Sequence, residues 1–234
     1  MRQIILDTET TGISPAHGHR IIEIGCLELM NRRITGNNFH VYINPEREID
    51  EGAFRVHGLS NEFLDDKPLF ADITERFLEF VRGAELVIHN APFDIGFLNH
   101  ELRLHDAKYR QMHDHCGVFD TLPYARRMHP GQKNSLDALC KRYFVDNTNR
   151  ELHGALLDAE LLAQVYLAMT GGQVIMFPDN LDHQIQQIEE SPIERLTQAH
   201  SLPVLVAEPT ELDEHAAFLD IIRSANAGRC AWDD

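Results

Sequence analysis

The spacing of apolar residues changes partway along the chain, and this change restricts the folds open to it. Strand-like apolar runs cover residues 2–6, 21–30 and 39–43, and loops are expected between them at residues 12–18 and 31–38. Closely spaced strands of this kind predict an antiparallel meander.

Helical spacing replaces the strand pattern after Asn61. Apolar residues from Phe70 to Val81 recur at helical intervals, and a buried-type strand at residues 85–89 follows them. Pro92 suits a first helical position. Further helices are expected at residues 92–104, 121–128, 135–143 and 155–169. Together these patterns predict an α/β domain with a mixed sheet.

The amino-acid composition changes at Gly171 and Gly172, which end the last of these helices. Gln-rich and Pro-containing stretches follow the two glycines. We therefore expect a compact domain at residues 1–172, a linker at 173–181 and a small interaction segment at 182–234.

The C-terminal part still carries signals of structure. An apolar run covers Leu202 to Ala207. Thr210 and Asp213 form a predicted capping pair before a helix at residues 216–222.

The charge of the chain argues against ordinary electrostatic binding of nucleic acid. Proteins that neutralise phosphates are usually basic, whereas this chain has a formal net charge of −16. Residues 173–234 carry 12 acidic and 3 basic side chains, so they contribute −9 and the preceding residues contribute −7. The tail is therefore a poor surface for gripping DNA.

The sequence also indicates in which cellular compartment the protein is located. It shows no signal-peptide pattern and no run of about 18 apolar residues, which predicts a cytoplasmic protein. The four cysteines (Cys26, Cys116, Cys140 and Cys230) are widely spaced and lack a CxxC pair. We expect reduced, structural thiols and neither a zinc site nor a disulfide framework.

Two carboxylates, Asp7 and Glu9, follow apolar residues of a strand that is expected to be central. Side chains two residues apart on a strand share a face. Adjacent carboxylates repel each other, and a hard divalent cation with oxygen ligands relieves that repulsion. The alternative is a strand end that turns acidic where it meets solvent.

A third carboxylate, Asp94, lies in the first turn of the helix after the strand at residues 85–89. A helix N-terminus favours a carboxylate for electrostatic reasons alone. The carboxyl ends of buried strands are, however, where α/β sheets build binding sites. Asp94 is therefore a candidate for the same cluster.

A histidine and a carboxylate, His153 and Asp158, stand on either side of Gly154. If a helix begins at Gly154 or Ala155, Asp158 lies in its early turns and His153 lies in the loop before it. From that loop His153 can approach a substrate and act as a general base. The alternative is an exposed loop histidine, one of 14 in the chain.

The segments around these residues resemble the three motifs of the DEDDh exonuclease superfamily. They read DTETTG at 7–12, NAPFD at 90–94 and HGALLD at 153–158. Longer stretches resemble the family of epsilon proofreading subunits of bacterial DNA polymerase III, and these are RIIEIG at 20–25, NRRITGNNFHVY at 31–42, RGAELVIHNAPFDIGF at 82–97, NSLDALC at 134–140 and ELHGALLDAELLAQVYLAMTGGQ at 151–173. The resemblance covers residues 2–173.

The resemblance implies a ribonuclease H-like fold, with a mixed five-stranded sheet flanked by helices. It implies that Asp7, Glu9, Asp94 and Asp158 hold two Mg²⁺ or Mn²⁺ ions and that His153 takes the proton of the attacking water. The reaction would release 5′-mononucleotides from the 3′ end of DNA.

The resemblance also implies contacts to the terminal nucleotide. Asp7, Glu9 and Asp158 belong to the substrate-binding set of the family. His57, within FRVHG at 54–58, matches a histidine that lies against the terminal nucleotide.

Gly52 departs from the family pattern. The epsilon family has a glutamate at this position, which contacts the sugar of the terminal nucleotide, and here Glu51 lies one position earlier. The loop at residues 13–19 also looks shorter than in other members of the family.

Partners are implied by the same resemblance. The segment from Gln173 to Phe177 resembles a peptide that binds the bacterial sliding clamp, although linker residues packed against the domain are the alternative. The acidic segment at 182–234 resembles the part that binds the polymerase catalytic (alpha) subunit, and a small theta-like subunit is a further expected partner. Polymerase and clamp would then hold the DNA, and no membrane is involved.

Rival functions remain at this stage. A superfamily member acting on RNA ends, such as ribonuclease T or oligoribonuclease, would share the catalytic residues, but it is not expected to need the tail. A noncatalytic scaffold joining polymerase to clamp is disfavoured because all five catalytic positions are filled. A dinucleotide-binding enzyme is disfavoured because the first strand leads to DTETTG and not to a glycine-rich phosphate turn.

Overall fold

The computed structural model describes residues 1–109, 111–148, 150, 152–171 and 208–225. The chain divides into two compact units, Met1–Met176 and Phe177–Asp234, which are described separately. Within the described ranges, no helix combines the length and the apolar character needed to cross a membrane.

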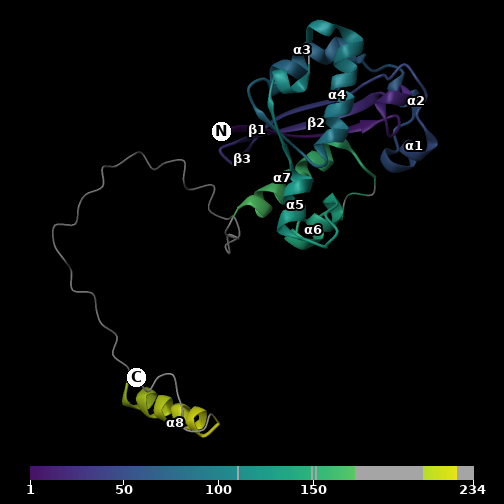
Figure 1. Ribbon diagram of the computed structural model, residues 1–234. Coiled ribbons are helices and arrows are strands. Elements are labelled where there is room, and N and C mark those ends of the chain that lie inside the picture. The colour runs from purple at the N-terminus through teal and green to yellow at the C-terminus, as the bar shows by residue number, and fades with distance from the viewer. Residues whose placement is uncertain (110, 149, 151, 172–207, 226–234) are drawn as a thin grey trace, which may run out of the picture. The chain divides into compact units, whose positions relative to one another are not determined.

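The first unit is built on a five-stranded sheet with the order β3-β2-β1-β4-β5 (Figure 1). Its strands are β1 (Arg2–Thr10), β2 (Ile21–Met30), β3 (Arg33–Tyr42), β4 (Glu85–Ile88) and β5 (Gly117–Asp120). The central strand β1 pairs antiparallel with β2 and parallel with β4. The predicted α/β class with a mixed sheet is therefore confirmed.

Strand boundaries differ from the predictions in two places. β3 begins at Arg33, so the loop predicted at residues 31–38 is wrong. The first six residues of this edge strand are exposed, and only Ile34 among them is a large apolar residue, so hydrophobic spacing gives no sign of the strand. β1 runs beyond the apolar residues 2–6 to Thr10, so the acidic pair lies inside the strand.

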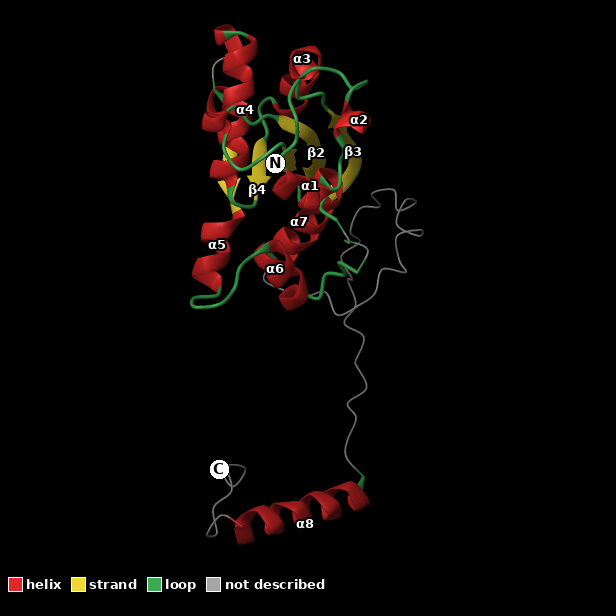
Figure 2. Ribbon diagram, turned by 90° about the vertical axis from the view of Figure 1, so that its right-hand side faces the viewer, coloured by secondary structure: helices red, strands yellow, loops and turns green. Residues whose placement is uncertain are grey.

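Helices cover both faces of the sheet, and Figure 2 shows the strands between α3 (Phe70–Val81) and α7 (Ala155–Thr170). On the first face α3 and α4 (Ala91–His105) bury their apolar sides against β1 and β2, in a core that includes Phe77 and Leu98. The remaining helices of this unit are α1 (Glu51–His57), α2 (Asn61–Leu64), α5 (Thr121–Met128) and α6 (Leu136–Tyr143), and short 3₁₀ turns lie at Pro15–His17, Ala107–Tyr109 and Met112–Asp114.

The opposite face is covered by α7, which buries Leu162 and Tyr166 against Ile5 of β1. Its outer side packs on α5 and α6, which lie beside it in Figure 1. α7 is thus buried on several sides, which explains why most of its side chains are apolar.

Close approach of α7 to the sheet depends on Gly25. A Cβ atom on this glycine would lie 2.2 Å from the backbone nitrogen of Leu156 and 2.3 Å from the carbonyl carbon of Ala155. Gly25 is also the β2 partner of Asp7. The missing side chain therefore places the first turn of α7 against the sheet next to Asp7.

Three of the four cysteines (Cys26, Cys116 and Cys140) are buried and free, as predicted. Cys230 lies outside the described residues.

The second unit contains α8 (Pro209–Ala225) among its described residues. The predicted capping pair is wrong, because the helix starts at Pro209 and Thr210 already lies in its first turn. The backbone N–H of Glu208 instead donates a hydrogen bond of 2.9 Å to the Glu211 carboxylate. The predicted linker at 173–181 and the apolar run at 202–207 lie outside the described residues.

Candidate active site

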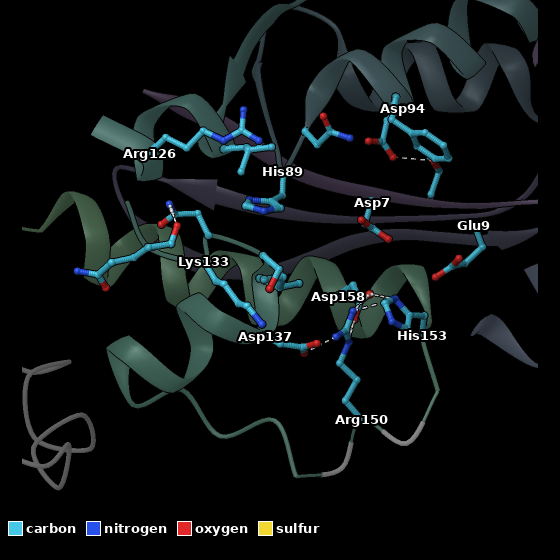
Figure 3. Close-up of a pocket in the computed structure, with 18 residues that line it drawn as sticks. Asp7, Glu9, His89, Asp94, Arg126, Lys133, Asp137, Arg150, His153 and Asp158 are labelled. Carbon is cyan, nitrogen blue, oxygen red and sulfur yellow. Dashed lines mark hydrogen bonds and ion pairs between the residues drawn. The ribbon is translucent and has the colours of Figure 1, made fainter. Parts of the chain in front are cut away.

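A cleft of about 790 Å³ opens at the carboxyl end of β4 and beside the middle of β1 (Figure 3). It is lined by all five residues that the sequence motifs single out, namely Asp7, Glu9, Asp94, His153 and Asp158. They come from β1, α4, the loop before α7 and α7 itself. The fold thus brings together residues from the two ends of the first unit.

Three of these residues form the tightest group. One ligand atom each of Glu9, His153 and Asp158 lies within 4.8 Å of the others. Asp158 is in the first turn of α7, which Gly154 precedes as N-cap, and His153 lies in the loop before it. That loop is tied to α1, because the His153 backbone N–H donates to the carbonyl of Val56 at 3.0 Å.

Asp94 is held in place from two directions. The Thr8 hydroxyl donates to its Oδ1 at 2.7 Å. Asn90, whose φ is 68°, forms the left-handed turn between β4 and α4, and its backbone N–H donates to the Asp120 carboxylate at 3.1 Å. This turn directs the first turn of α4, with Asp94, into the cleft.

The carboxylates destabilise one another's charge. Burial, and then the Asp94, Glu9 and Asp158 charges, raise the pKa of Asp7 well above its usual value. Burial and the neighbouring acids Asp158, Glu23 and Asp94 raise the pKa of Glu9 to about 8. Burial also raises the pKa of Asp94 to about 7. A cation in the cleft would favour the ionised carboxylates, because it would offset both their burial and their mutual repulsion.

Asp158 behaves differently because it has a cationic partner that the sequence motifs do not indicate. Burial opposes its ionisation, but hydrogen bonds from His153 and Arg150 lower the pKa of Asp158. Arg150 donates from Nε to Oδ1 at 2.5 Å and from Nη2 to Oδ2 at 2.6 Å. Both side chains are nearly buried, with exposed fractions of 7% for Arg150 and 4% for Asp158.

Arg150 also connects this pair to its surroundings. Its Nη1 donates to Asp137 Oδ1 at 2.5 Å, and its Nη2 lies 2.8 Å from Nδ1 of His153. The same Nδ1 lies 3.2 Å from Asp158 Oδ2, so the guanidinium and the carboxylate compete for it. Sequence reasoning missed Arg150 because no spacing rule connects an arginine in a loop to a carboxylate in the next helix.

A second cavity of about 340 Å³ adjoins the cleft and shares Thr8, Glu9 and Phe93 with it. His57 and Gly52 line this cavity.

His57 is buried, and its Nδ1 accepts a hydrogen bond from the Leu59 backbone N–H at 3.0 Å. Burial, and then the nearby His153, lower the pKa of His57, so the ring is neutral and its proton is on Nε2. Nε2 has no partner among the described residues, which leaves a buried donor beside the cavity.

Gly52 contributes no side chain to this cavity, and a Cβ atom there would meet nothing within 4 Å. The preceding Glu51 does not replace the missing carboxylate. It forms an exposed ion pair with Arg55 at 2.7 Å and does not line the cavity.

These residues fit a divalent cation site. The group of Glu9, His153 and Asp158 offers oxygen and nitrogen donors within reach of one ion. Asp7 and Asp94 add two carboxylates, and burial is the main cause that raises their pKa values.

The known proteins that this chain resembles are named as exonucleases or as a DNA polymerase III subunit. The family described as Exonuclease matches residues 4–166. DNA polymerase III subunit epsilon of Salmonella typhimurium is 54% identical over 237 residues, which cover 99% of this chain and 97% of that protein. The protein of the same name from Escherichia coli K12 is 52% identical over 236 residues, again covering 99% and 97%.

Solved structures agree with the sequence comparison. A structure of Exonuclease X in complex with 5′ overhanging duplex DNA is 27% identical, with a TM-score of 0.58, and covers 74% of this chain and 94% of that one. A zinc-bound complex of E. coli ExoI with single-stranded DNA has a TM-score of 0.62 at 18% identity, and covers 74% of this chain and 41% of that one. The second match shows a shared fold.

Proposed function

The chain belongs to the Exonuclease family, and we propose that it is the 3′→5′ proofreading exonuclease subunit of a bacterial replicative DNA polymerase. The observation that carries this proposal is the convergence of four carboxylates and one histidine in a single cleft. Relatives with about half of their residues identical, named DNA polymerase III subunit epsilon, support the DNA substrate and the polymerase complex.

We assign Asp7, Glu9, Asp94 and Asp158 to the binding of two divalent ions, Mg²⁺ or Mn²⁺. When bound, such a pair of ions activates the attacking water and stabilises the leaving oxygen of an in-line displacement. The protein's part is to fix the carboxylates, and the hydrogen bonds to Asp94 from Thr8 and to Asp158 from Arg150 do this.

His153 is assigned as the general base. Its side chain is 45% exposed, so a water molecule can reach it. Nδ1 lies 3.2 Å from Asp158 Oδ2, and a proton on Nδ1 directed at this carboxylate leaves Nε2 to accept the proton of the attacking water.

The terminal nucleotide is assigned to the cavity beside Glu9. We assign Asp7, Glu9 and Asp158 to the scissile phosphate, and His57 Nε2–H to an oxygen of the terminal nucleotide. Gly52 lines the same cavity but offers no polar group, so we assign it no contact through a side chain.

We also propose the domain division and partners that the resemblance implies. Residues 1–172 form the exonuclease domain, and residues 173–181 form a linker with a clamp-binding segment from Gln173 to Phe177. Residues 182–234 bind the polymerase catalytic subunit, and a small theta-like subunit is a further partner. Deletion of residues 174–234 should abolish polymerase binding in a pull-down and spare nuclease activity, and tight binding by the shortened chain would contradict this assignment.

The function is tested by degradation of 3′-mismatched DNA primers, with matched RNA as the competing substrate. The wild type should remove nucleotides from the mismatched DNA end with Mg²⁺ or Mn²⁺ and should be inactive in EDTA. Asp7→Ala and Glu9→Ala should each lose nearly all activity, whereas Asp66→Ala, at an exposed carboxylate outside the cleft, should not. Wild-type rates in either cleft variant, or a preference for RNA, would overturn the proposal.

A further inference from the structure

Two cations line the cleft on the side away from the terminal-nucleotide cavity. We propose that Arg126 and Lys133 form a wall that binds the phosphates of the DNA strand upstream of the scissile bond. This proposal rests on the proposed function, and it adds a subsite and a direction for the strand.

Arg126 and Lys133 share the cleft with Asp7 and Asp158. Figure 3 shows them across the cleft from Glu9 and His153. Both side chains are exposed, and neither forms an ion pair within the part of the chain that the structure describes. In a chain with a net charge of −16, two unpaired cations in one cleft mark a place for an anion.

The loop that carries Lys133 is fixed by its own hydrogen bonds. Asn134, which is 7% exposed, donates to the carbonyls of Gln132 at 2.9 Å and His129 at 3.3 Å. Arg142 of α6 donates to the carbonyl of Lys133 itself at 2.9 Å and to Asn134 Oδ1 at 3.2 Å. Lys133 is therefore presented from a defined backbone position.

Arg126 stands in the last turn of α5, a short helix anchored at its start. The Asp120 carboxylate accepts the Leu122 backbone N–H at 2.9 Å, and Thr121 contacts Nδ1 of His89 at 2.9 Å. Burial lowers the pKa of His89 despite the opposite effects of Asn134 and Asp120, and Arg126 adds to the lowering, which favours the neutral form of His89.

Nearby carboxylates are already engaged and leave the two cations available. Asp137 accepts from Arg150 at 2.5 Å. Asp120 accepts backbone N–H groups of Leu122 and Asn90 at 2.9 Å and 3.1 Å. The positive charge of the wall is therefore not neutralised by the acids closest in sequence.

The order of the sites gives the strand its direction. The cavity with His57 meets the cleft at Thr8, Glu9 and Phe93, whereas Arg126 and Lys133 line the cleft alone. Figure 3 shows both cations across the cleft from Glu9. A strand whose terminal nucleotide is at His57 and whose scissile phosphate is at the acids must place its next phosphates toward the wall.

The test compares two substrates of the full-length protein. One is a single-stranded oligodeoxythymidine, and the other is the p-nitrophenyl ester of thymidine 5′-phosphate, which has no upstream nucleotide. Arg126→Gln and Lys133→Gln should each raise KM for the oligonucleotide roughly two- to fivefold, as expected for exposed ion pairs. In each variant the rise in KM for the oligonucleotide should clearly exceed the rise in KM for the ester.

A neutral methylphosphonate at the linkage next to the scissile bond identifies the contact. The substitution should raise KM of the wild type by a similar factor. It should raise KM less in the variant that has already lost the contact. Fluorescence anisotropy in EDTA gives the binding constant for the oligonucleotide at several salt concentrations. The slope of its logarithm against the logarithm of the salt concentration should become shallower by roughly 0.7 for each contact removed.

Matched controls are available on α5, which carries Arg126, and on α6, which follows the loop with Lys133. Arg127 stacks on Tyr124 and does not line the cleft, and Lys141 of α6 is also outside it. Arg127→Gln and Lys141→Gln should leave both substrates unaffected. The proposed wall would be contradicted by equal rises in KM on both substrates, by an unchanged salt slope, or by the same effect in the controls. A wild type that cleaves neither substrate would contradict the proposed function instead.

Discussion

Gly25 lies so close to Leu156 that a Cβ atom on the glycine would be 2.2 Å from the leucine backbone nitrogen. Gly25→Ala must therefore push the first turn of α7, with Asp158, away from Asp7. We expect a loss of about 10²-fold in kcat, because a shift of about 1 Å can have this effect, together with a loss of about 1–3 kcal/mol of stability from overpacking. Primer degradation and thermal unfolding measure the two effects. Gly96→Ala in α4, where a Cβ atom meets nothing, is the control and should retain activity; equal activity in both variants would contradict this account.

The stability of the first unit should fall with rising pH when divalent ions are removed. The pKa of Glu9 is raised from 4.5 to about 8 and that of Asp94 from 3.8 to about 7, so the folded state holds protons that the unfolded chain has released. Stability from these groups is full below about pH 4 and is lost as the pH rises toward 8. Thermal unfolding in EDTA between pH 5 and about 8.5 should show this decline. Glu9→Gln should flatten it and Mg²⁺ should reverse it, and a flat wild-type profile would refute the cause.

Removal of Arg150 should destabilise the protein through Asp158. Arg150→Gln leaves a nearly buried carboxylate without its cation, which typically costs about 3–5 kcal/mol. In EDTA the Tm should drop by roughly 2–4 °C per kcal/mol, and saturating Mg²⁺ should restore part of the loss because it supplies positive charge. Arg55→Gln removes an exposed pair, with side chains 70% and 82% exposed, and should cost less than about 1 kcal/mol. Similar losses in the two variants would show that the Arg150 pair has no special role.

His57→Phe tests the buried donor beside the terminal-nucleotide cavity. The ring volume is largely kept and Nε2–H is lost, so KM for short oligonucleotides should rise roughly two- to tenfold, the effect of one hydrogen bond. The metal affinity, measured by Mn²⁺ titration, should not change. A reduced kcat with an unaltered KM would instead assign His57 to the chemical step.

Gly52→Glu should add the carboxylate that the family pattern has at this position. A Cβ atom at position 52 would meet nothing within 4 Å, and Gly52 lines the cavity, so we expect the glutamate side chain to reach into it. We expect KM for the mismatched end to fall a few fold, and Gly52→Ala separates this effect from the stabilisation of α1 by a non-glycine residue. Equal KM values for the two variants would show that the contact does not form.

The sequence predicts the acidic pair and the start of α7 well because both follow from local rules. Side chains two apart on a strand share a face, and Gly154 marks the position where Asp158 enters a helix and His153 does not. These rules place the candidate catalytic residues without knowledge of the contacts between them.

Features that depend on tertiary contacts were not predictable in this way. β3 begins in a mostly polar, exposed stretch, and the four-residue β5 is too short to give a period. Arg150 lies in a loop and acquires its role from Asp158 in α7 and Asp137 in α6. The contact of Gly25 with α7 likewise depends on how the helix packs on the sheet.

The site takes two carboxylates from β1, the first strand of the chain, one from α4, and the last from α7, the final helix of the first unit. A nascent chain on the ribosome therefore carries Asp7 and Glu9 long before Asp158 has been synthesised. The set of carboxylates that we assign to metal binding is therefore complete only after α7 has been synthesised.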